Sequence, residues 1–114
     1  MTTTSSDSQA FQALETQYFY LNTNFNRLFA AAKTPEDQDT LRQDFVQARD
    51  NYRKAQVERF RDGDPMVQDL TAKVVAAQKQ IEASAEKLQD VSKVLDLVTD
   101  AVNLASRLVI LAAA

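Results

Sequence analysis

The feature that most constrains this chain is an apolar repeat that begins after Pro65. Apolar or small side chains recur there at alternating spacings of three and four, with Ser84 as the only polar member. The members are Val67, Leu70, Val74, Ala77, Ile81, Ser84, Leu88, Val91, Leu95, Val98, Val102, Ala105, Val109 and Ala112. This spacing places one stripe along one side of an α-helix, and no Gly or Pro interrupts it. The sequence therefore predicts a long helix over about 65–113, roughly 73 Å in length.

Two shorter amphipathic segments precede this helix. Ser8 is a suitable N-cap for the first, which carries the stripe Phe11, Leu14, Tyr18, Leu21, Phe25, Leu28 and Ala32. The second begins with a capping Thr34 and with Pro35 at the first helical position, and its stripe is Leu41, Phe45, Ala48, Tyr52 and Ala55. We expect helices over about 8–33 and about 35–61, the second ending before Gly63.

The scarcity of turn residues points to an all-α fold. Tight turns between β-strands depend on Gly and Pro, and the chain has only one Gly and two Pro in 114 residues, too few for the turns of a sheet. Short connections make the first two helices an antiparallel hairpin, which we expect to pack on the long helix as a three-helix bundle or coiled-coil-like assembly. Residues 1–7 are expected to be a disordered polar tail, and 8–114 a single helical domain.

The hairpin is too short to cover the long helix. Helices of about 26 residues span roughly 39 Å, so residues 92–114 are expected to form an apolar overhang. Two adjacent apolar stripes run along this overhang, which implies neighbours on two sides. The expected interface residues are Val94, Leu97, Val98, Ala101, Val102, Leu104, Ala105, Leu108, Val109 and Leu111.

Three arrangements would cover this apolar surface, which is too large to stay exposed. Copies of the chain can pack together as a homo-oligomer. The segment can fold back through a kink near 90–93 or 96–100 and form a fourth helix. A different helical protein or a membrane can cover it. The lack of Gly and Pro near 90–100 argues against the kink.

The favoured function is a non-enzymatic protein–protein interaction or assembly module that associates through this segment. The alternative is a membrane-active subunit, of helical toxin or secretion-translocator type, with the same segment in lipid. Tyr20 lies off the apolar stripe and is a candidate partner contact.

The composition of the chain offers few candidate catalytic residues. The chain has no His and no Cys, which excludes disulfides, Cys/His zinc sites and Ser–His–Asp or Cys–His catalysis. The turn at 62–64 lacks the further oxygen ligands of a calcium loop. Asp96 and Asp100 share one helical face but are interpreted as part of a solvated strip. We expect no catalytic residues, no cofactor and no metal.

The charges of the chain bear on its partners and location. The net charge is −3, and basic residues between Arg49 and Arg61 alternate with acidic ones, so no nucleic-acid surface is expected. Residues 1–7 lack the basic and apolar regions of a Sec signal. The apolar run 108–114 is too short to span a membrane, and extending it backwards to about 20 residues includes Arg107, Asn103, Asp100 and Asp96, which argues against a transmembrane helix. The expected location is the cytoplasm, or outside after export by a signal-less route.

The layout of the chain resembles that of small helical proteins exported by bacterial secretion systems. The shared features are its size, helical hairpin and polar N-terminal tail. The Trp-x-Gly turn that marks one such family is absent, because the chain has no Trp and its first turn is Lys33-Thr34-Pro35.

Overall fold

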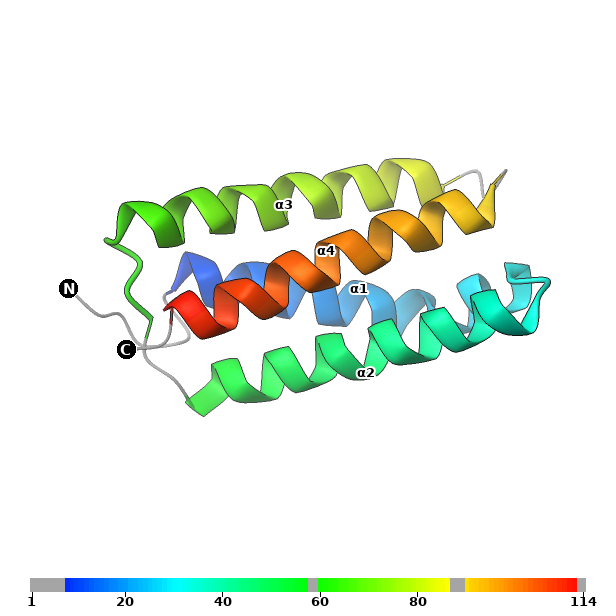
Figure 1. Ribbon diagram of the computed structural model, residues 1–114, viewed down its shortest axis with the longest axis horizontal. Helices are drawn as coiled ribbons and strands as arrows, with labels where there is room; N and C mark the ends of the chain where they lie inside the picture. Colours follow the sequence, from blue (N-terminus) through cyan, green and yellow to red (C-terminus); the bar gives the residue numbers. More distant parts are fainter. Residues whose placement is uncertain (1–7, 58–59, 87–89, 113–114) are drawn as a thin grey trace.

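The computed structural model describes residues 8–57, 60–86 and 90–112, which form four α-helices (Figure 1). The helices are α1 (Gln9–Ala31), α2 (Pro35–Val57), α3 (Pro65–Ala85) and α4 (Val91–Ala112). Each helix runs antiparallel to the one before it in the chain. The predicted all-α class is confirmed.

The four helices pack as a bundle with a rhombic cross-section. α1 and α4 occupy the short diagonal, since they contact each other and both remaining helices. α2 and α3 do not touch, and Figure 1 shows them at opposite edges, with α4 in front of α1 between them. Along the bundle α1 and α3 run parallel, as do α2 and α4. The connection between α2 and α3 therefore joins opposite corners of the bundle.

The unbroken helix predicted over 65–113 is wrong, and the fold-back that was the alternative is what the structure shows. α3 ends at Ala85, and α4 begins at Val91 and packs beside α3. Asp90 caps α4, because its Oδ1 accepts the backbone N–H of Lys93 at 3.2 Å and its carbonyl accepts that of Val94. A capping side chain can begin a new helix without Gly or Pro nearby. The three-helix arrangement gives way to four helices.

The other predicted helices and caps agree with the structure at their starts. The Ser8 hydroxyl accepts the backbone N–H of Phe11 at 3.1 Å, and Thr34 Oγ1 accepts that of Asp37 at 3.1 Å. α1 and α2 each end a few residues earlier than predicted. Residues 1–7, predicted to be a disordered tail, lie outside the described residues.

The apolar stripes meet in the centre of the bundle. One cluster of buried side chains surrounds Leu14, Phe60 and Leu108, and a second surrounds Leu28 and Val98. Each fully buried Leu or Phe stabilises the fold by roughly 2 kcal/mol. These clusters tie α4 to α1, so the core depends on the helix that folds back.

Candidate functional site

The residues predicted as an interface lie mainly in the core of the chain itself. Of the ten, three are partly buried and pack against that core: Leu97, Leu104 and Leu111. The other seven are buried: Val94, Val98, Ala101, Val102, Ala105, Leu108 and Val109. α1, α2 and α3 thus cover the stripes that were expected to overhang, as far as residues 92–112 are described. Seven of the ten side chains are therefore covered by the chain itself.

The seam between α2 and α4 is closed by a ladder of polar pairs. The ladder repeats every seven residues and joins hydroxyls of α4 to carboxylates or an amide of α2: Ser92 to Asp37 (2.8 Å), Thr99 to Asp44 (2.6 Å) and Ser106 to Asn51 (3.1 Å). Burial raises the pKa of Asp44, and the hydrogen bond from Thr99 opposes this shift with a smaller effect. Since α2 and α4 are parallel, a seven-residue step returns both to the same side. The ladder fixes the register of this seam.

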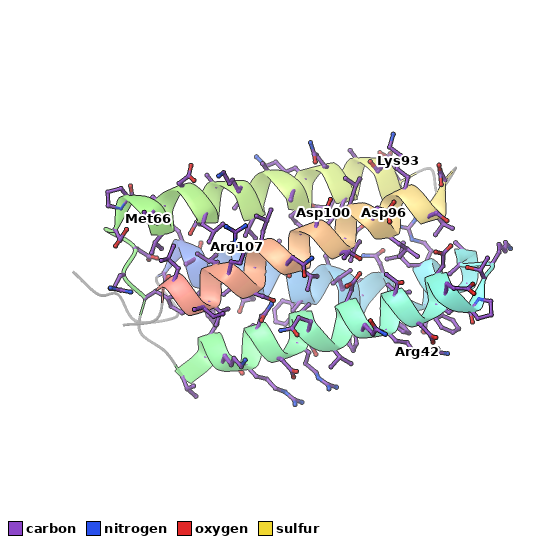
Figure 2. The ribbon with its side chains drawn as sticks, in the orientation of Figure 1. Arg42, Met66, Lys93, Asp96, Asp100 and Arg107 are labelled. Atoms are coloured by element: carbon purple, nitrogen blue, oxygen red, sulfur yellow. The ribbon has the colours of Figure 1, made fainter. Side chains whose placement is uncertain are left out.

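The seam between α1 and α2 is closed by aromatic rings. Tyr18 stacks on Tyr52 with ring centroids 5.2 Å apart, and Phe25 packs on Phe45 at 5.2 Å. The guanidinium of Arg42, labelled in Figure 2, lies 4.8 Å from the centre of another ring on α1. Offset and tilted ring pairs at such distances are favourable beyond the area they bury. This seam is well packed, although its outer edge remains partly exposed.

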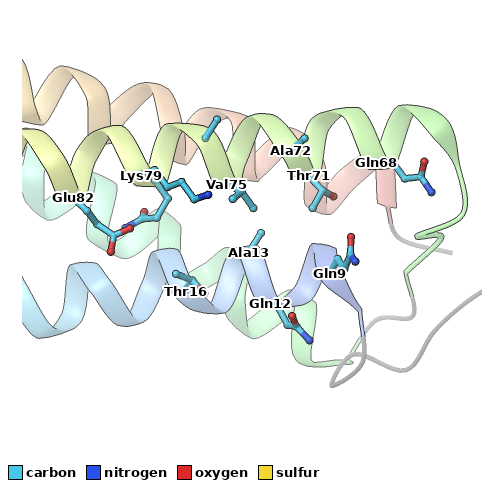
Figure 3. Close-up of a pocket in the computed structure, with 12 residues that line it drawn as sticks. Gln9, Gln12, Ala13, Thr16, Gln68, Thr71, Ala72, Val75, Lys79 and Glu82 are labelled. Carbon is cyan, nitrogen blue, oxygen red and sulfur yellow. The ribbon is translucent and has the colours of Figure 1, made fainter.

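The seam between α1 and α3 is different, because a groove of about 630 Å³ lies between these helices (Figure 3). Its lining residues are mostly small or uncharged: Gln9, Gln12, Ala13 and Thr16 from α1, and Gln68, Thr71, Ala72, Val75, Ala76, Gln78, Lys79 and Glu82 from α3. Figure 3 shows Ala13 and Val75 pointing toward the gap from opposite helices. Side chains this short do not fill the space between the two helices. The groove is thus a consequence of composition.

The groove contains a buried amide without a hydrogen-bond partner. The Gln78 side chain lines the groove and is only 3% exposed, yet neither its Oε1 nor its Nε2 is paired among the described residues. Gln17 of α1 is 1% exposed, and its Nε2 is also unpaired. A buried polar group without a partner costs about 1–3 kcal/mol. An incoming donor or acceptor would recover part of that cost.

The charged end of the groove lies at Glu82, near Tyr20. Burial raises the pKa of the Tyr20 phenol; the charge of Arg27 lowers that pKa, and the charge of Glu82 raises it. Arg27 Nη1 also donates to the carbonyl of Ala85 at 3.1 Å, which ties the end of α3 to α1. Tyr20, predicted as a partner contact, is half-buried at this end of the groove.

The charged side chains of α4 form no comparable site. Figure 2 shows Asp96, Asp100 and Arg107 along the face of α4 turned to the viewer, and all three are exposed. Within 8–57, 60–86 and 90–112, no group of three or more carboxylates is arranged to hold a metal ion. The described helices also include none long and apolar enough to cross a membrane.

The groove was missed by sequence reasoning, which attributed the free surface to α4. A signal for it exists, since α3 carries a second stripe of mostly small or polar residues at heptad spacing. The width of the seam that this stripe faces depends on how α1 and α3 are held by the rest of the bundle.

Comparisons of the chain with protein-family models, curated proteins and solved structures find no match.

Proposed function

We propose that this chain is a non-enzymatic assembly module that associates with a second copy of itself through the face formed by α1 and α3. The single observation that carries the proposal is the groove above the unpaired Gln78 amide. Helices commonly dock by laying one face into a groove between two others. This surface replaces the α4 segment as the proposed contact, because α4 is used in the core.

The outer face of α3 presents a continuous row of side chains beside the groove. Its exposed positions on the groove side are spaced four, three, four and three residues apart: Gln68, Ala72, Val75, Lys79 and Glu82. Positions at this spacing lie along one side of a helix, where a second helix can contact all of them. The inward stripe of α3, which includes Val74 and Ile81, is buried in the bundle. α3 can therefore contact neighbours on two sides.

The composition of this face sets the expected strength of association. The face is polar and small, and Val75 is its main exposed apolar side chain, at 39%. A few large buried side chains usually supply most of the binding free energy of an interface, and this face lacks such a cluster. We expect a dissociation constant on the order of micromolar or weaker.

The experiment is sedimentation equilibrium of the purified chain from about 1 µM to about 1 mM, a range that spans such a dissociation constant. The apparent mass should rise from 12.8 kDa toward twice that value. Val75→Glu should remain monomeric, because it places a charge in the interface. Val46→Glu is the matched control, since Val46 is 42% exposed on α2 and should not affect association.

Two results would contradict the proposal. The wild type could remain at 12.8 kDa throughout the range, or Val75→Glu could associate as the wild type does. A monomer at every concentration would leave the membrane-active alternative, which leakage from liposomes of anionic and neutral lipid would test.

A further inference from the structure

We infer that a central polar layer, made of one residue from each helix, sets the position of α3 along α1. The layer divides the core, because the two apolar clusters lie on either side of it. Its members are Gln17 of α1, Asn51 of α2, Gln78 of α3 and Ser106 of α4. The first three of these are at most 3% exposed. This role belongs to the single chain and does not depend on self-association.

The level of each member along the bundle follows from the buried residues that flank it in its own helix. Each helix has two such residues, seven positions apart, with one in each cluster. The first cluster contains Leu14, Ala55, Val74 and Val109, and the second contains Leu21, Ala48, Ile81 and Val102. Every member of the central polar layer lies three positions from one flanking residue and four from the other. Two contacts agree with this level. Asn51 Nδ2 donates to Ser106 Oγ at 3.1 Å, and the rings of Tyr18 and Tyr52, next in sequence to two members, stack on each other.

The apolar repeat alone leaves the position of α3 along α1 undetermined. Buried residues recur every seven positions in both helices, as Leu14, Leu21 and Leu28 in α1 and as Val67, Val74 and Ile81 in α3. Sliding α3 by seven residues, about 10 Å, would therefore place apolar side chains opposite apolar side chains again. The polar ladder does not prevent this, because it joins α2 to α4. The connection 32–34 holds α1 close to α2, whereas 58–64 and 86–90, on either side of α3, are longer.

Gln17 and Gln78 are the residues that break this repeat. In the observed position their carboxamides lie in one layer of two neighbouring helices, and each has a nitrogen without a partner. Since helix axes in bundles are about 8–10 Å apart, two long side chains of one layer can reach each other, and one amide can then donate to the other. Sliding α3 by seven residues would instead surround Gln78 with apolar side chains, where its amide has no polar group within reach. Buried polar residues set the register of coiled coils in this way, at a cost in stability.

The first test is a double-mutant cycle with Gln17→Leu and Gln78→Leu, which replace each amide by an apolar side chain of similar size. Either substitution alone leaves the other amide without its layer partner, whereas both together remove the cost of burying the two amides. In the Gln17→Leu background, Gln78→Leu should therefore lower the unfolding equilibrium constant about fivefold more than it does in the wild type. Urea unfolding measures this constant. Thr71→Val, two turns away on α3, is the matched control, and its effect should agree within about twofold in the two backgrounds.

A second test counts the arrangements that the chain adopts. The double variant Gln17→Leu/Gln78→Leu has an unbroken apolar repeat in α1 and α3, so it should stay folded but populate more than one position of α3. NMR of the backbone amides, at a concentration where the chain is monomeric, should show extra α3 signals. These signals should be absent from the wild type and from Ile81→Leu, a core substitution outside the layer. Equal effects of Gln78→Leu in the two backgrounds would overturn the inference, as would a single set of signals from the double variant.

Discussion

Asp44 is a carboxylate that the fold removes from water, in the seam between α2 and α4. It is 8% exposed and accepts a hydrogen bond from Thr99 at 2.6 Å. Burial is the larger effect, so its pKa in the folded chain lies above 3.8, the ordinary value of an aspartate side chain. Over the pH range between these two pKa values, the folded chain binds more protons at this site than the unfolded chain. The contribution of Asp44 to stability is therefore most favourable below pH 3.8 and declines as the pH rises through the raised pKa.

Asp44→Asn should remove this pH dependence. At pH 7 the variant should be more stable than the wild type by about 1 kcal/mol, because a neutral amide can accept the Thr99 hydroxyl without the cost of burying a charge. The difference should shrink toward pH 3, where the wild-type carboxyl is protonated. Urea unfolding at several pH values measures it. The exposed Asp96→Asn serves as the control for net charge, and a destabilised Asp44→Asn at pH 7 would show that the carboxylate is needed in its charged form.

At the level of elements, Asp90 explains why four helices form instead of three. Its side chain and carbonyl accept the first free backbone N–H groups of α4. An exposed Asp between apolar stripe residues also occurs within helices, so the sequence alone does not distinguish a cap from a surface charge. The break between α3 and α4 is then stabilised by packing, because the return of α4 to the bundle buries both of its apolar stripes.

Asp90→Ala should lower the free energy of unfolding by about 1 kcal/mol, the usual cost of losing an N-cap. Chemical denaturation followed by circular dichroism would measure this loss. Asp100→Ala, in the exposed middle of α4, is the comparison and should change stability by less than half as much. Equal effects of the two substitutions would mean that the Asp90 side chain does not stabilise the start of α4.

The starts of the first three helices, the caps at Ser8 and Thr34 and the inward-facing residues could be predicted from the sequence, because each depends on local spacing, whereas the break before α4 could not. Thr34, Ser8 and the stripe of α1 are examples. The polar ladder could not, although hydroxyls at 92, 99 and 106 and their partners at 37, 44 and 51 both repeat every seven residues. Two repeats become a ladder only when α2 and α4 are known to be parallel neighbours. The groove likewise depends on the distance between α1 and α3, which no local pattern reports.

At the scale of the whole molecule, the rhombic arrangement gives the helices unequal protection. α1 and α4 contact every other helix, whereas α2 and α3 each contact only two. Amide hydrogens in the middle of α1 and α4 should therefore exchange most slowly, and those of α3 along the groove should exchange faster. Native-state hydrogen exchange resolved by NMR measures this order at concentrations where the chain is monomeric. Slower exchange in α3 than in α1 would contradict the arrangement.

The rhombic arrangement also bears on how the chain can fold during synthesis. The two helices that meet inside the bundle are the first and the last of the four, separated by the whole of α2 and α3. When a ribosome has released α1 to α3, the face of α1 that carries Leu14 and Leu28 still lacks the helix that covers it. The core can close only after α4 has emerged, so a stalled or truncated product would expose apolar surface to chaperones and proteases. Closure of this core therefore waits for the last helix of the bundle.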